Sequence, residues 1–186
     1  MTFEEMCLLP EAEQKALFLR LSAIRHKAKV VNFSATYKIG ADALSRNSGL
    51  KPPDAKKLLR IYWERNKAIL DVERACIVKE IGHKKWLLNP VNKFYYLLRA
   101  DKDRFSTLNQ GTAAYVFDLW IAYIRKLGLS INFQYHDEFV ANIPIGDNEW
   151  AKQIIEESLN LLNNKLALNV LIGCSVNFGN SYNQIH

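Results

Sequence analysis

Residues 129–143, LSINFQYHDEFVANI, contain two short runs in which apolar and polar side chains alternate. The alternation runs from Ile131 to Tyr135 and again from Phe139 to Ile143. A period of two is typical of a strand that buries one face and exposes the other. The stretch therefore predicts an antiparallel hairpin. Its tip carries three polar residues, His136, Asp137 and Glu138.

The segments on both sides of this hairpin have the marks of helices and of short strands. The expected helices cover residues 11–39, 41–47, 54–80 with a break near Asn66, 107–127 and 146–165. Asp54 is expected to cap the third of these. Two short strands are expected around Asn89-Pro90 within residues 82–98, and a last strand over residues 170–176. Helices followed by strand–turn–strand–helix–strand predict an α+β fold with an antiparallel sheet.

Composition gives weaker constraints on function. The chain has 186 residues and is 49% hydrophobic, enough for one core or one core with an attached subdomain. Lys and Arg number 25 against 19 Asp and Glu, a net charge of +6. This excess suits a partner rich in phosphate, although many proteins without such a partner share it.

Several features predict a location in the cytoplasm, which for a viral protein means the host cytoplasm. The three cysteines are widely spaced and fit neither a zinc site nor a disulfide framework. Acidic residues near the N-terminus argue against a signal peptide. No apolar run approaches the roughly 20 residues that a spanning helix needs, so no membrane partner is expected.

Four side chains spaced by four residues form the first candidate site: Arg25, Lys29, Phe33 and Tyr37. On a helix they lie along one slowly turning stripe about 18 Å long. Two cations at one end and two aromatic rings at the other suit the phosphates and the base of a nucleoside triphosphate. A solvated basic turn followed by core aromatics would give the same spacing.

Two further segments are candidates for chemistry. Adjacent carboxylates at a hairpin tip, Asp137 and Glu138, can supply the oxygen ligands that Mg²⁺ prefers, although aspartate is also common in ordinary polar turns. Residues 109–114, NQGTAA, open a predicted helix with small side chains that allow close approach of a backbone or a nucleic acid. Helix packing alone would explain small residues equally well.

Together and in this order, the segments resemble the family A (Pol I-like) DNA polymerases. Residues 25–37 resemble motif B of the fingers, and residues 134–138, QYHDE, resemble motif C of the palm, with about a hundred residues between them. Residues 110–114, QGTAA, and the ending NSYNQIH at residues 180–186 are also similar to the family. The resemblance implies helical fingers in residues 1–81 and part of the antiparallel-sheet palm of a right-hand fold in residues 82–186.

The resemblance also implies a role for each residue. Arg25 and Lys29 would bind the incoming dNTP, with Lys29 also placed to protonate the leaving pyrophosphate. Phe33 would lie against the sugar and Tyr37 near the templating base pair. Two Mg²⁺ ions would be bound by Asp137 with support from Glu138. DNA primer-template would be contacted by His136 at the primer end and by Gln110 in the minor groove.

Three departures from the family pattern stand out. Lys38 follows the motif B tyrosine where the family has glycine, and Lys102 and Ser106 stand where the family tends to have arginine and asparagine. Motif A, which carries the other metal-binding aspartate, belongs before motif B, yet the first aspartate here is Asp42. The thumb is also absent.

Three interpretations remain open at this level. The preferred one is a split, phage-type polymerase in which a second chain supplies motif A and the thumb; a piece of a longer chain fits the same pattern. The second is a non-catalytic DNA-binding or assembly subunit that keeps the polymerase fold. The third is a fragment of a single-subunit RNA polymerase, from which Phe33 and Glu138 differ.

Overall fold

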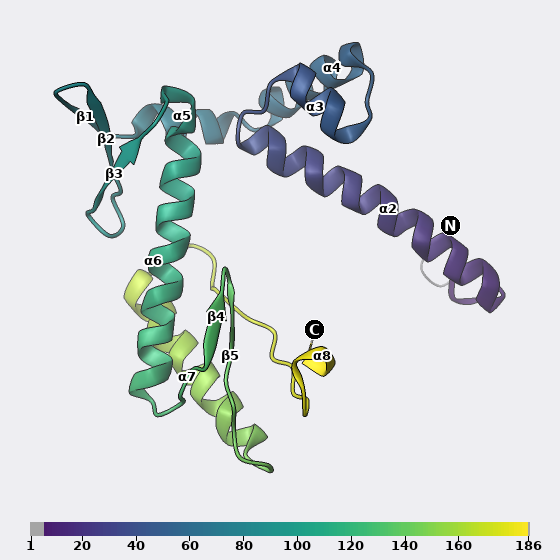
Figure 1. Cartoon of the computed structure of the whole chain (residues 1–186), viewed down its shortest axis with the longest axis vertical. Helices are drawn as coiled ribbons and strands as arrows, with labels where there is room; N and C mark the ends of the chain where they lie inside the picture. The colour runs from purple at the N-terminus through teal and green to yellow at the C-terminus, as the bar shows by residue number, and fades with distance from the viewer. Residues whose placement is uncertain (1–5, 186) are drawn as a thin grey trace. The chain divides into compact units, whose positions relative to one another are not determined.

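The chain contains both helices and small antiparallel sheets, and a computed structural model describes residues 6–185 of it (Figure 1). The predicted α+β class is confirmed. The chain divides into two compact units, Met1–Leu108 and Asn109–His186, which are described separately. The division into fingers at residues 1–81 and palm at residues 82–186 concerns function, and it stays a prediction.

Residues 11–75 of the first unit form helices, with the expected breaks near Gly40 and Asn66, whereas the first and the last of these helices end earlier than predicted. They are α2 (Glu11–Thr36), α3 (Ala41–Ser48), α4 (Pro52–Arg65) and α5 (Lys67–Ala75). Gly40 precedes α3, and Asn66 separates α4 from α5. The prediction that Asp54 caps its helix is wrong, because α4 already begins at Pro52 and has no side-chain cap. A proline fits the first helical turn well, since its fixed φ is helical and the missing N–H would be unpaired there anyway.

The predicted extension of α5 to residue 80 is also wrong. The helix ends at Ala75, and Val78–Ile81 forms strand β1, paired antiparallel with β2 (Lys84–Leu88). β-branched residues at positions 77, 78 and 81 favour a strand, and Gly82 adopts a positive φ of 62° in the tight turn. Strand pairing across this turn therefore overrides the helical pattern that precedes it.

The expected strands around Asn89-Pro90 are present as β2 and β3 (Tyr95–Leu98), which complete a three-stranded antiparallel sheet in the order β1-β2-β3. A short 3-10 helix, η1 (Asp101–Asp103), then leads into α6 (Arg104–Lys126). Asp101 binds Lys85 of β2 at 2.6 Å and Arg104 at 2.7 Å. These two hydrogen-bonded cations lower the pKa of Asp101 to about 2.

The second unit holds most of α6, the strands β4 (Phe133–Tyr135) and β5 (Glu138–Val140), α7 (Asn148–Leu166) and the short α8 (Tyr182–Ile185). Its apolar core lies between α6 and α7 and includes Trp120, Ile124, Leu129 and Leu162. The indole Nε1 of Trp120 donates to Ser158 Oγ at 2.8 Å, which satisfies the polar groups of both buried side chains.

The strand expected over residues 170–176 is absent from the described chain. Asn163 of α7 provides the physical reason, because its side-chain amide occupies both backbone groups of Ile172. Asn163 Nδ2 donates to the Ile172 carbonyl at 2.9 Å, and the Ile172 N–H donates to Asn163 Oδ1 at 2.8 Å. The segment is thus held against α7 by a side chain and not by a strand ladder.

The expected location rests in part on the cysteines and on the length and polarity of the helices. The three cysteines are free thiols, although Cys7 and Cys174 are exposed and Cys76 is half-buried, so none is a core residue. Within residues 6–185, the helices are too short or too polar for any of them to cross a membrane.

Candidate functional site

All four residues of the predicted nucleotide stripe lie on or at the end of α2. Arg25, Lys29 and Phe33 are exposed on the helix, and Tyr37 is its C-terminal cap residue. The Nζ atom of Lys29 lies 5.7 Å from the centre of the Phe33 ring, within cation–π range. The helix therefore presents these side chains to solvent, as a binding stripe requires. The alternative, in which the aromatic residues pack in a core, does not hold for Phe33, which is 51% exposed.

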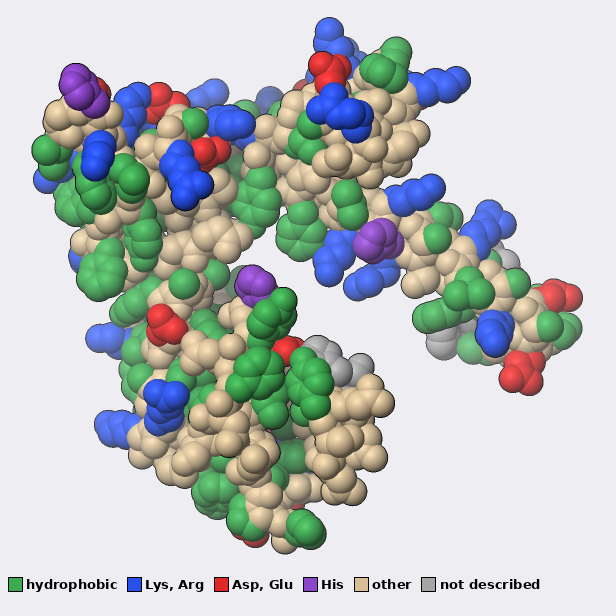
Figure 2. All heavy atoms as spheres, in the orientation of Figure 1, with side chains coloured by type: hydrophobic (Ala, Val, Ile, Leu, Met, Phe, Trp, Pro, Cys, Tyr) green, Lys and Arg blue, Asp and Glu red, His purple; other side chains and the backbone are tan. Residues whose placement is uncertain are grey.

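The charge of α2 changes sign along the helix, from acidic in the first turn to basic in the remainder. Its acidic residues, Glu11 and Glu13, are confined to the first turn, and the remainder of the helix carries only basic ionisable groups (Figure 2). These are Lys15, Arg20, Arg25, His26, Lys27 and Lys29. A run of this kind attracts polyanions such as phosphate groups.

The hairpin in the second unit places both predicted metal ligands at its tip. Phe133 pairs with Val140 and Tyr135 pairs with Glu138, so residues 136 and 137 form a two-residue turn. His136 adopts a positive φ of 52°, which is uncommon for a residue with a side chain. The ring centres of His136 and Tyr135 lie 4.6 Å apart, edge to face. Asp137 is exposed at the turn, and Glu138 is half-buried at the start of β5.

Tyr182 of α8 contributes to the surroundings of Glu138. Its hydroxyl donates toward Glu138 Oε1 at 3.5 Å, and its ring lies 6.1 Å from that of Phe133. Desolvation, followed by the negative charge of Glu138, raises the pKa of Tyr182 above its ordinary value. The phenol therefore stays protonated at neutral pH and can act as a donor to the carboxylate.

A groove of about 1370 Å³, lined by both apolar and polar residues, adjoins the hairpin, and both carboxylates stand on its wall. Helix α6 contributes Phe117 and Trp120, and β5 contributes Phe139, whose ring meets Trp120 edge to face at 5.3 Å. Figure 2 shows hydrophobic side chains gathered around the hairpin on the face drawn. Neither β4 nor β5 pairs with any other strand of residues 6–185. The hairpin thus has open edges beside an apolar surface.

Asp137 and Glu138 provide carboxylate oxygens, which Mg²⁺ prefers. Within the described part of the chain, no three His, Cys, Asp or Glu side chains come close enough to hold a metal ion by themselves. The hairpin thus offers two carboxylate ligands that suit Mg²⁺, which is fewer than a complete magnesium site needs.

The remaining predicted site residues lie near the start of α6. Gln110 is exposed, and the whole NQGTAA segment lies inside the helix, five to ten residues after its first residue, so it does not open the helix. The hydroxyl of Ser106 donates to the Asp103 carbonyl at 3.0 Å, which closes the first turn of α6. Lys102 is exposed in η1.

A model of DNA polymerase family A matches residues 19–184. The chain therefore belongs to DNA polymerase family A.

Curated relatives agree with this assignment. The chain is 22% identical to DNA polymerase I of Borreliella burgdorferi over 179 residues, covering 88% of this chain and 19% of that protein. It is 24% identical to DNA polymerase I of Streptococcus pneumoniae over 157 residues, covering 74% of this chain and 18% of that protein. The chain thus spans about a fifth of the length of the curated relatives that it matches.

Sequence reasoning missed two contributors to the hairpin. Tyr182 was part of the C-terminal stretch that resembles the family, but no role followed from that resemblance alone. Trp120 was also missed. It contacts Phe139 edge to face and donates a hydrogen bond to Ser158, and because these residues lie far apart in the chain, no local sequence pattern predicted the contacts.

Proposed function

We propose that this chain forms fingers and part of the palm of a template-directed DNA polymerase that becomes active when a second chain supplies motif A and the thumb. Its substrates would be dNTPs and a DNA primer-template, and its cofactor two Mg²⁺ ions. The observation that carries the proposal is the β4–β5 hairpin, which holds Asp137 and Glu138 at the wall of an open groove.

The case for a second chain rests on charge and on the open sheet edge. Two Mg²⁺ ions about 4 Å apart repel one another, so several carboxylates must converge on them. The hairpin contributes two, and within residues 6–185 no third His, Cys, Asp or Glu side chain lies close enough to complete a metal site with them. A strand that paired with the hairpin would cover apolar side chains such as Phe133, which is 44% exposed, and could bring the missing aspartate beside Asp137.

On this proposal the residues of the nucleotide stripe bind different parts of the substrates. Arg25 and Lys29 would bind the triphosphate through charge-assisted hydrogen bonds, and Lys29 could also pass a proton to the departing pyrophosphate. Phe33 would lie against the sugar, and Tyr37 would border the templating base pair.

The hairpin and α6 would serve the metals and the primer. Asp137 would bind the metal ions, and Glu138, held by Tyr182, would support them. Bound Mg²⁺ would neutralise the charge that develops on the attacking and leaving oxygens. His136 would contact the primer end, and Gln110 would reach the minor groove.

The first experiment compares the chain alone with the chain and its partner. The partner is identified by mass spectrometry of proteins that copurify with the tagged chain. Primer extension is then measured with Mg²⁺ and four dNTPs. We expect no extension by the lone chain and extension by the pair. Template-directed synthesis by the lone chain would refute the need for a second chain.

The second experiment separates the polymerase from a non-catalytic DNA-binding subunit. Asp137→Asn removes one negative charge from the metal ligands but leaves the basic helix intact, so extension should be abolished while primer-template affinity is retained. Asp118→Asn, which changes an exposed aspartate on α6, serves as the matched control. Normal extension by the pair that contains Asp137→Asn would refute the metal role and favour the non-catalytic alternative.

A further inference from the structure

The C-terminal end of α2 closes in a hydrogen-bond pattern that normally uses glycine. The Lys38 N–H donates to the Ala35 carbonyl at 2.9 Å, and the Ile39 N–H donates to the Ser34 carbonyl at 3.0 Å. This pair of bonds defines a Schellman motif, in which the residue after the helix cap adopts a left-handed conformation. Lys38 is that residue, with φ 56°. A side chain there is disfavoured, so its contacts must offset the strain of the backbone.

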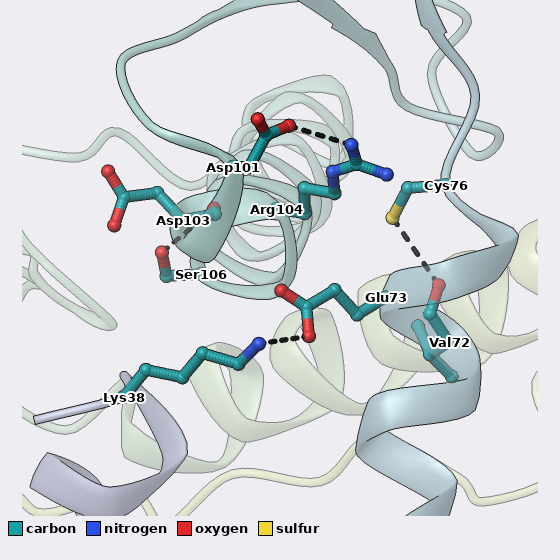
Figure 3. Close-up of polar contacts among 8 residues, drawn as sticks. All are labelled: Lys38, Val72, Glu73, Cys76, Asp101, Asp103, Arg104 and Ser106. Carbon is teal, nitrogen blue, oxygen red and sulfur yellow. Dashed lines mark hydrogen bonds and ion pairs between the residues drawn. The ribbon is translucent and has the colours of Figure 1, made fainter.

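The side chain of Lys38 reaches an acidic residue on another helix. Its Nζ donates to Glu73 Oε2 of α5, and the two side chains point toward each other (Figure 3). Glu73 is a buried carboxylate, with only 8% of the residue exposed. The Nζ atom also lies 5.8 Å from the centre of the Trp63 ring on α4. An ion pair with one buried partner is costly to break, because the remaining charge stays desolvated.

A second bond ties the same end of α2 to α4. The hydroxyl groups of Thr36 and Tyr62 lie 2.6 Å apart and share a hydrogen bond. The residues on both sides of Tyr37 are therefore held by side chains of the following helices. With its neighbours anchored, the backbone of Tyr37 has less freedom to turn than the end of an isolated helix would have.

We propose that Lys38 is a positioning residue that, through Glu73, fixes the end of α2 to α5 and thereby sets the orientation of Tyr37. The expected consequence of this contact is selection of the incoming nucleotide, and that consequence rests on the proposed function. Removing the tie would let Tyr37 move away from the nascent base pair. Nucleotide binding would weaken, while the metal site on the other unit would be unchanged.

The tie between α2 and α5, which is the Lys38–Glu73 ion pair, is tested by hydrogen exchange of backbone amides in the intact chain. This measurement needs no polymerase activity. Lys38→Met keeps the length and the aliphatic part of the side chain but removes the charge, and Glu73→Gln removes the opposite charge. We expect each variant to raise the exchange rates of the amides of residues 37–39 by roughly tenfold, and the double variant to add little to either. Unchanged exchange in both single variants overturns the tie.

The functional consequence is tested by kinetics with the partner chain. We expect Lys38→Met to raise the KM for the correct dNTP by roughly tenfold with kcat within about twofold, because the tie acts on binding. Lys38→Arg should restore most of the loss, since it keeps the positive charge. Lys38→Gly suits the left-handed backbone, so it folds without the tie and should show the same rise in KM.

A matched control on α5 is Asp71→Asn, which breaks an exposed ion pair with Arg74 and should leave both exchange and KM unchanged. A normal KM in both Lys38→Met and Lys38→Gly overturns the positioning role. Failure of the proposed function would appear differently, as inactivity of the wild-type pair, while the exchange data would still decide whether the tie exists.

Discussion

The buried bond between Trp120 and Ser158 should be a main support of the hairpin that carries Asp137. Ser158 Oγ accepts from the Trp120 indole at 2.8 Å and donates to the Ile155 carbonyl at 2.7 Å. Ser158 is fully buried and Trp120 is 8% exposed. Replacement by alanine leaves the indole N–H without an acceptor in a place that water does not reach.

The cost of Ser158→Ala follows from this burial. An unsatisfied buried donor destabilises the folded state by about 1–3 kcal/mol, which is more than the net value of an exposed hydrogen bond. We expect a decrease of this size in the free energy of unfolding, measured by urea denaturation and followed by far-ultraviolet circular dichroism. The slope of the transition should not change.

A double-mutant cycle identifies the cause. In a Trp120→Phe background there is no indole N–H to satisfy, so Ser158→Ala should then cost less than about 0.5 kcal/mol. The same cost in both backgrounds would mean that the serine stabilises the fold through other contacts. A cost near zero in the wild-type background would refute the reasoning entirely.

Three further predictions concern the other sites. If the stripe on α2 holds the triphosphate, Arg25→Ala should weaken dNTP binding and Lys29→Ala should lower kcat, each by about ten- to a hundredfold in primer extension with the partner; wild-type kinetics in both would return the stripe to a solvated basic surface. Phe33→Tyr should raise dideoxynucleotide incorporation, because the added hydroxyl can replace the bond that the missing 3′-hydroxyl would make; unchanged discrimination would show that Phe33 is not beside the sugar. The pKa of Asp101 falls from 3.8 to about 2, so its ion pairs stabilise the folded state above about pH 4 and lose this effect as the pH falls toward 2. Asp101→Asn should therefore unfold more easily than wild type at pH 7, and this difference should shrink markedly by pH 2; a difference between their melting temperatures that does not depend on pH would contradict this assignment.

The sequence by itself determined the features that depend on near neighbours. The helix breaks at Gly40 and Asn66 follow from residue type, and the alternation on both sides of residues 136 and 137 predicted the hairpin and the place of its carboxylates. The spacing by four placed Arg25, Lys29 and Phe33 on one exposed helix. These features could be predicted because a helical turn or a two-residue hairpin involves only a few consecutive residues.

Only the tertiary structure decided which distant residues meet. Pairing with β2 turned residues 78–81 from the expected helix into a strand, and Asn163 took the backbone groups of Ile172 that the expected last strand would have used. Lys38 and Glu73, 35 residues apart, form their ion pair only because α5 returns to the end of α2. Such contacts depend on chain closure and on competition among alternative partners, and neither is visible in the local pattern of side chains.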